Sequence, residues 1–190
     1  MNPYKLQQEL EPLIKVGQTE TVIERLEAEL RSLPTSDFHK VLDLNFTNTP
    51  HFIGKELEQF FKQESRRYDV AAIYLETNGF AINTGLWYFD LFGFKTYGGH
   101  TDYDWLAEWD SDDSSSPALT GMEELQEVYA DQLYDSPQDM TYLCSLVVVA
   151  KFQDLIRRGV ECAKDLNCPV FATSHDYEFI AEFNRKIEEG

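Results

Sequence analysis

The stretch "DVAAIYLETNGFAINTGLWYFDLFGF", from Asp69 to Phe94, decides the fold class. β-branched and aromatic residues dominate it, and such residues favour strands. The pair Asn78-Gly79 accepts the positive φ angles of a type I′ hairpin turn, and a second turn at residues 83–85 follows. The stretch therefore predicts three antiparallel strands joined as a meander.

Segments before and after this stretch show the apolar spacing of three or four residues that is typical of amphipathic helices. They cover residues 3–17, 19–33 and 50–63 before it, and residues 120–134, 140–166 and 177–190 after it. The middle of segment 140–166 is apolar nearly all round, which predicts a central helix covered on more than one side.

Three further segments bear on the sheet. Residues 38–46 alternate between apolar and polar side chains, which is the period of a half-buried strand. Residues 168–176, "CPVFATSHD", fit a short buried strand that ends in a turn. Residues 103–109, "YDWLAEW", fit either a fourth strand or a short helical turn, so the meander is predicted to have three or four strands.

Length and composition predict that these elements share one core. The chain has 190 residues, within the usual range of one domain, and 43% of them are hydrophobic. We therefore predict a single α+β domain over residues 1–190, with an antiparallel three- to four-stranded meander flanked by N-terminal and C-terminal helices. Its parts are an N-terminal helical layer (1–35), a sheet region (38–110) and a mainly helical part (120–190).

Three features predict the cellular location. The opening residues, "MNPYKLQQELEPLIK", lack the charged and apolar regions of a secretory signal. The longest apolar run, Leu146–Ala150, is far shorter than the ~20 residues that cross a bilayer. Three cysteines, an odd number, fit free thiols in a reducing compartment better than a disulfide framework. A cytoplasmic protein without membrane contact is expected, while the oligomeric state stays open.

The charge of the chain is concentrated in one segment. The net charge is −18, and between Lys95 and Lys151 there is no other Lys or Arg but twelve Asp and Glu residues. Nucleic-acid binding depends on Lys and Arg displacing counterions from phosphates, so this segment predicts that nucleic acid is not a partner. A basic protein would be attracted to it. Acidic surfaces also serve solubility alone, and the sequence leaves that alternative open.

Aromatic residues lie among these carboxylates, and rings beside carboxylates are typical of a surface that binds a basic partner. We therefore predict a non-catalytic acidic binding protein, without a cofactor, that engages a basic protein partner. The chain is similar in size and charge to bacterial toxin-immunity proteins and nucleic-acid mimics, and an immunity or inhibitor role is the expectation that follows. The surface is centred on residues 102–113 and 123–131, and one of its two tryptophans could instead seal the core. The predicted partner-binding residues are Asp102, Asp104, Trp105, Glu108, Trp109, Asp110, Asp112 and Asp113.

The alternative from a different class is a metal-dependent enzyme that uses His100, Asp102 and His175. A His-x-Asp pair with a distant His is the ligand set of non-haem iron oxygenases. With Arg185 ten residues beyond His175, these four positions resemble those of 2-oxoglutarate oxygenases. That family carries its ligands on a jelly-roll, whereas two predicted helices separate the two histidines here, so the binding protein is the preferred prediction.

Two other patterns lack the spacing their chemistry needs. The sequence "DSDDSSS" from Asp110 offers oxygen ligands at alternate positions, but Ser115 stands where a calcium-binding EF-hand loop requires Gly, and Pro117 interrupts the loop. Adjacent residues in the triplet at 174–176, "SHD", point in different directions and cannot form a catalytic relay with one another. We therefore predict no catalytic residue and no metal site.

Overall fold

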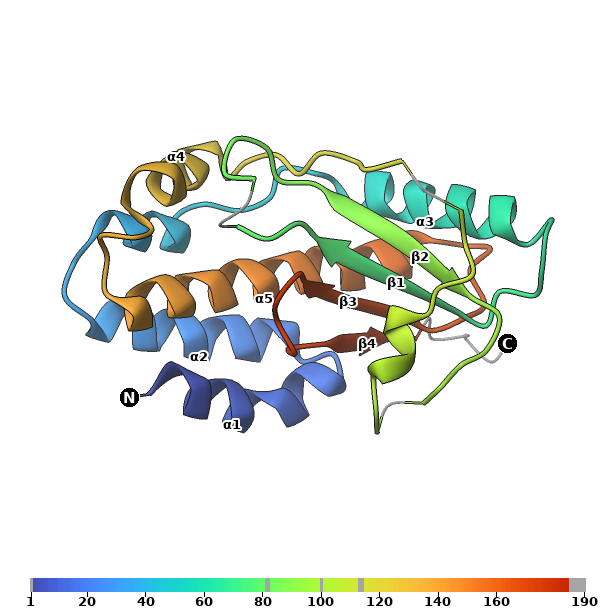
Figure 1. Ribbon diagram of the computed structural model, residues 1–190, viewed down its shortest axis with the longest axis horizontal. Coiled ribbons are helices and arrows are strands. Elements are labelled where there is room, and N and C mark those ends of the chain that lie inside the picture. The colour runs from blue at the N-terminus through green and yellow to red at the C-terminus, as the bar shows by residue number, and fades with distance from the viewer. Residues whose placement is uncertain (1, 81–82, 100, 113–114, 185–190) are drawn as a thin grey trace.

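The computed structural model describes residues 2–80, 83–99, 101–112 and 115–184, and these form a four-stranded sheet with helices packed on it (Figure 1). The strands are β1 (Ala72–Thr77), β2 (Phe89–Phe94), β3 (Val170–Ser174) and β4 (Ala181–Phe183), in the order β2-β1-β3-β4. The β1 strand runs antiparallel to β2 but parallel to β3, and β4 is antiparallel to β3. The α+β class is confirmed, whereas the antiparallel meander is wrong because the central pair of strands is parallel.

The helices follow the predicted segments closely, except that the described part of the last predicted segment, 177–190, is not helical. They are α1 (Pro3–Lys15), α2 (Thr19–Ser32), α3 (Pro50–Glu64), α4 (Glu123–Gln132) and α5 (Gln138–Cys162). Two short 3-10 helices, η1 (Asp37–Leu42) and η2 (Asp104–Ala107), complete the structure. Side-chain caps begin two of the helices: Asn2 accepts a hydrogen bond from the backbone N–H of Tyr4 in α1, and Thr49 accepts one from Phe52 in α3. No described helix combines the length and the apolar character needed to cross a bilayer.

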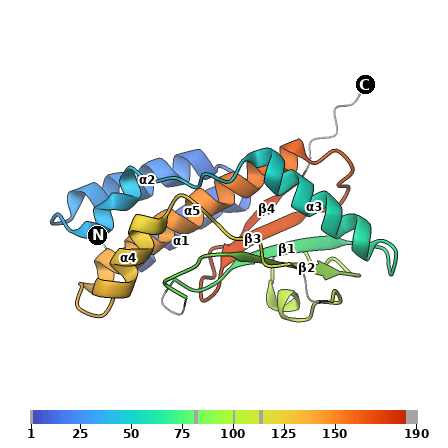
Figure 2. The same cartoon turned by 90° about the horizontal axis from the view of Figure 1, so that it is seen from above.

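The long helix α5 lies between the sheet and the outer helices, as Figure 2 shows from above. Its apolar residues are buried on every side; Val147, Val148 and Val149, which successively face different directions, are all fully buried. The predicted central helix is therefore confirmed, and it forms the middle of the hydrophobic core.

The two central strands are covered on both faces. Ile73 and Leu75 of β1 belong to the core shared with α5, whereas Ala72 and Tyr74 belong to a second apolar cluster on the other face. That second cluster is closed by Leu106 of η2. Burial on both faces explains why β1 reads as a continuous apolar run, a pattern typical of strands inside parallel sheets.

The predicted hairpin at Asn78-Gly79 is wrong. Neither residue has a positive φ angle, and Asn78 instead bridges a wider connection. Its Oδ1 accepts a hydrogen bond from the backbone N–H of Tyr88, 2.8 Å away, and its Nδ2 donates to the carbonyl of Leu86. Phe80, the first residue of the predicted second strand, is buried against Trp87 in the core, and residues 81–82 lie outside the described part of the chain.

Residues 38–46 are not a strand. Ser36 and His39 cap the start of η1 reciprocally, and the 3-10 helix places Phe38 and Val41 on one side, where both are fully buried. The apolar residues three positions apart therefore outweigh the alternation seen in the sequence.

The predicted C-terminal helix from residue 177 is also wrong within its described part. Phe179 and Ala181 face the main core and Ile180 faces the second cluster, which is the alternation of a strand. This alternation produces β4, which pairs with β3 after a turn at Asp176. Residues 185–190 lie outside the described part of the chain.

Candidate functional site

The predicted binding residues other than Asp113 lie on the segment 101–112, which covers the outer face of the sheet and contains η2. Trp105 packs into the second apolar cluster: its ring centroid lies 4.8 Å from that of Phe94 and 5.4 Å from that of Phe171. Its Nε1 donates a hydrogen bond to the carbonyl of Gly99, 3.1 Å away. Trp105 therefore holds the segment onto the sheet, and its ring is used for packing.

Trp109 is the tryptophan that reaches the surface. Its side chain is 51% exposed, and its ring centroid lies 4.9 Å from that of Phe92 at the outer face of β2. Asp102, Asp104 and Glu108 on the same segment are exposed, and none of them is paired with a Lys or Arg among the described residues. We call these four residues the Trp109 surface.

The next two predicted carboxylates anchor the end of the segment. Asp110 accepts a hydrogen bond from the backbone N–H of Lys95 at 2.8 Å and pairs with its Nζ at 3.1 Å. These contacts, the backbone hydrogen bond above all, hold the pKa of Asp110 below its ordinary value. Asp112 pairs with Arg67 at 2.9 Å, and Asp113 lies outside the described residues. Asp110 and Asp112 are therefore already neutralised by partners within the chain.

The acidic segment does not form one continuous face. Figures 1 and 2 place η2, the short yellow-green helix, and α4 toward opposite ends of the molecule. The exposed carboxylates of α4 are consequently separated from the Trp109 surface; they are Glu123, Glu124, Glu127 and Asp131.

The residues of the metal-enzyme alternative have other contacts. The side chain of Asp102 accepts a hydrogen bond from the backbone N–H of Asp104. His175 lies on the turn after β3, with its Nδ1 2.7 Å from Glu76. His100 and Arg185 lie outside the described residues, and among those described no three His, Cys, Asp or Glu side chains are placed to share a metal ion.

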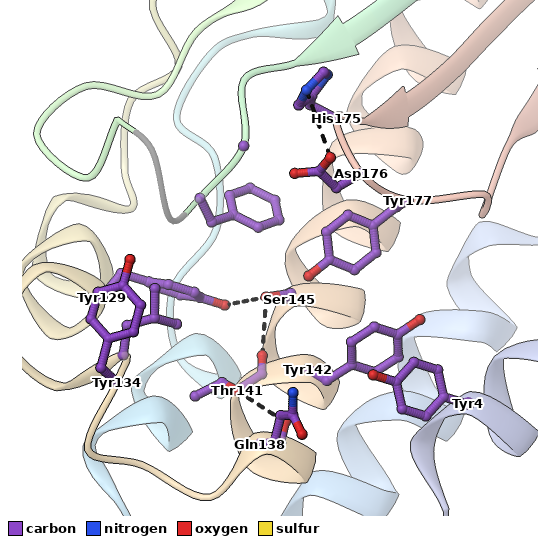
Figure 3. Close-up of a pocket in the computed structure, with 13 residues that line it drawn as sticks. Tyr4, Tyr129, Tyr134, Gln138, Thr141, Tyr142, Ser145, His175, Asp176 and Tyr177 are labelled. Carbon is purple, nitrogen blue, oxygen red and sulfur yellow. Dashed lines mark hydrogen bonds and ion pairs between the residues drawn. The ribbon is translucent and has the colours of Figure 1, made fainter.

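A second candidate site, which the sequence does not predict, is a pocket of about 400 Å³ beside the carboxyl ends of β1 and β3. Parallel strands end at the same edge of a sheet, so the loops that follow them meet there. The loop after β1 supplies Gly79 and Phe80, and the turn after β3 supplies residues 175–177. We call this cavity the tyrosine pocket, because Tyr4, Tyr129, Tyr134, Tyr142 and Tyr177 line it (Figure 3).

The aromatic rings that line the tyrosine pocket form a spatial series in which each ring contacts the next. Ring centroids are 4.3 Å apart for Tyr4 and Tyr142, and 5.7 Å apart for Tyr142 and Tyr177. Phe80 continues the series, with its centroid 6.0 Å from that of Tyr177 and 5.9 Å from that of Tyr129. Aromatic side chains therefore surround the cavity from α1, α4, α5 and both loops.

Hydroxyl groups form one side of the tyrosine pocket. The hydroxyl groups of Tyr129 and Ser145 are 2.6 Å apart, and Ser145 donates to the carbonyl of Thr141 one turn earlier in α5 (Figure 3). Burial raises the pKa of Tyr129 and the pKa of Tyr177 well above the ordinary value of a tyrosine, and both hydroxyl groups are neutral at physiological pH.

Charged groups lie at one end of the tyrosine pocket. Asp176 has a φ angle of 70°, a left-handed conformation that Asp and Asn adopt more readily than other residues with a side chain. Its Oδ1 lies 3.7 Å from Nε2 of His175. The other nitrogen of His175 contacts Glu76, so the imidazole lies between two carboxylates.

Known proteins offer no match to this chain: no family model, curated protein or solved structure corresponds to it. The Trp109 surface and the tyrosine pocket are therefore the two candidate functional sites of the described residues.

Proposed function

We propose that the protein is a non-catalytic binding protein whose Trp109 surface engages a basic protein partner, in the manner of a toxin-immunity protein or inhibitor. The observation that carries this proposal is the half-exposed indole of Trp109 on a segment that also carries three exposed carboxylates. Tryptophan is prominent among the residues that dominate binding energy at interfaces, because a large ring is desolvated when a partner covers it.

The segment that carries Trp109 is held in place before any partner binds. Its ring rests on Phe92, and the neighbouring Trp105 fixes the segment to the sheet. The ion pairs of Asp110 and Asp112 hold the far end of the segment. A surface fixed in this way loses little conformational entropy when it binds.

The carboxylates of the Trp109 surface would act on the rate of association. Asp104 directly precedes Trp105 in the sequence and Glu108 directly precedes Trp109, and both carboxylates are exposed to solvent. Exposed charges speed the approach of a partner of opposite charge, and salt screens this effect. Lys15, whose Nζ lies 5.5 Å from the ring centroid of Tyr103 on the same segment, is paired with Glu11 at 3.0 Å.

The test compares three baits in affinity purification from native lysate. They are the unmodified chain, the Asp104→Lys/Glu108→Lys variant and the control Glu124→Lys/Glu127→Lys, which makes the same charge change on α4. We expect a basic protein to be retained by the unmodified chain and the control and lost by the first variant. The association rate of that basic protein with the unmodified chain should fall as salt rises, and its association rate with the Asp104→Lys/Glu108→Lys variant should fall less steeply. Equal retention by all three baits would reject the Trp109 surface as the binding site.

A Trp109→Ala variant separates burial from charge. We expect it to keep the association rate and its salt dependence but to dissociate about thirtyfold faster or more, since interface hot-spot residues cost about 2 kcal/mol or more when truncated. Unchanged dissociation would remove Trp109 from the interface. Asp110 and Asp112 are unsuitable for this test, because replacing them would release the segment itself.

A further inference from the structure

We propose that the tyrosine pocket binds a small organic cation, of the methylated ammonium class. This inference is independent of the Trp109 surface, which lies on a different part of the molecule. Aromatic faces carry negative charge density, and several rings around one cavity form the kind of cage that holds a methylated ammonium group.

The geometry of the rings supports this ligand class. Tyr142 and Tyr177 are stacked with an interplanar angle of 28°, whereas Phe80 is tilted by 52° against Tyr177 and by 49° against Tyr129. These neighbouring rings line the pocket together (Figure 3). A cavity of about 400 Å³ lies within the usual range for small-molecule sites.

Two of the rings, those of Tyr142 and Tyr129, are held by hydrogen bonds before a ligand arrives. Tyr142 donates a hydrogen bond from its hydroxyl to Oε1 of Gln7 in α1, and Tyr129 is held by Ser145. The pKa of Tyr142 is raised to about 12, chiefly by burial, so its hydroxyl stays protonated. Ordered rings lower the entropic cost of binding.

The charges around the tyrosine pocket favour a cation over an anion. Asp176 is the carboxylate in its lining, and no Lys or Arg is among the described lining residues. His175 is positive when protonated, but it lies between Glu76 and Asp176, so the three groups together keep a negative excess. The first turn of α5, whose N-terminal dipole would favour an anion, carries Asp139, which opposes that preference.

The experiment titrates the full chain by calorimetry with choline, with its neutral isostere 3,3-dimethylbutan-1-ol, and with acetate. Choline and the alcohol have the same shape and differ in charge. We expect choline to bind roughly tenfold more tightly than the alcohol, the difference that partly desolvated cation–π contacts supply, and acetate not to bind. Equal affinity for choline and the alcohol, binding of acetate alone, or no binding of choline would each overturn the proposal.

Two matched pairs of variants locate the site. Tyr142→Leu should weaken choline binding several-fold, whereas Tyr142→Phe keeps the ring and should retain it. Asp176→Asn keeps a residue that tolerates the left-handed conformation and should weaken choline binding. Asp69→Asn removes the same charge at an exposed position before β1 and should not weaken it. Thermal unfolding checks that each variant is folded; should Tyr142→Leu fail this check, the Asp176 pair decides. Choline affinity that is unchanged in Asp176→Asn and in a folded Tyr142→Leu variant would exclude this pocket.

Discussion

The Nδ1 atom of His175 lies 2.7 Å from Oε1 of Glu76, although the two residues are 99 positions apart in the sequence. Glu76 is the penultimate residue of β1 and His175 follows the last residue of β3, so the parallel register of the two strands brings them together. The other carboxylate oxygen of Glu76 accepts a hydrogen bond from Tyr74. The hydrogen bond to Glu76 is the main cause that raises the pKa of His175 above 6.5.

This pair predicts a pH-dependent contribution to stability. A histidine whose pKa is raised by folding stabilises the folded state fully below its unfolded pKa, and the contribution is lost as pH rises through the folded pKa. His175→Gln should therefore lower the free energy of unfolding more at about pH 5.5 than at about pH 8.5. Urea unfolding at both pH values measures this, with His51→Gln on the exposed side of α3 as the control. An equal loss at both pH values would show that the ionic part of the pair is negligible.

Gln153 predicts a large stability effect from one buried amide. It is fully buried in α5, and its Nε2 donates to the carbonyls of Ala172 and Phe179, at 2.9 and 2.6 Å. Gln153→Met should lower the free energy of unfolding by about 1 to 3 kcal/mol, because the carbonyl of Ala172 loses this donor, whereas that of Phe179 keeps the hydroxyl of Thr173. Gln153→Glu should cost more, since it adds a buried charge. Chemical denaturation measures both, and Gln59→Met at an exposed position of α3 should change little.

The contact between α3 and α5 depends on Gly159. A Cβ atom there would lie 2.4 Å from Cγ2 of Ile53, so Gly159→Ala should destabilise the protein by about 1 to 3 kcal/mol. The sign is diagnostic, because the same change in an exposed helix stabilises by about 1 kcal/mol. In the Ile53→Ala background the cost should fall only in part, because Cγ2 is removed while Cβ of residue 53, 2.7 Å from the added atom, remains; a double-mutant cycle measures this. Gly85→Ala, where an added Cβ meets no atom within 4 Å, is the control.

The three cysteines should differ in reactivity. Cys144 and Cys168 are buried, and burial raises the pKa of each thiol to about 12, whereas Cys162 is partly exposed at the end of α5. Iodoacetamide should label one thiol of the folded chain, and raising the pH to about 9 should leave the other two unlabelled. Cys162→Ser should remove the rapid labelling. Rapid reaction of all three thiols before unfolding would contradict this assignment.

The helices could be predicted from the sequence because their signal is local. Leu26 and Leu30 of α2 repeat at helical spacing and are fully buried, and Thr49 caps α3 as its position before Pro50 indicates. The order and direction of the strands are not a local property. The parallel pairing of β1 with β3 joins segments nearly a hundred residues apart, and Asn78 supports two different connections, a hairpin or the wider loop observed.

The two candidate sites also differ in how far the sequence predicts them. The aromatic and acidic character of residues 102–112 is visible in the sequence, but whether Trp105 or Trp109 faces solvent depends on which of them meets Phe171. The tyrosine pocket gives no comparable signal, because its rings come from helices α1, α4 and α5 and from two loops. Only the spacing of Tyr142 and Ser145 along one helix face hints at a shared surface.

The parallel pairing of β1 and β3 also determines how late the sheet can be completed during synthesis on the ribosome. When β1 and β2 have emerged, the edge of β1 that will receive β3 is still open, and it stays open while α4 and α5 are translated. An open strand edge invites pairing with other chains. A nascent chain stalled within α5 would therefore display this edge together with the uncovered apolar side of the helix, and would be a natural substrate for chaperones.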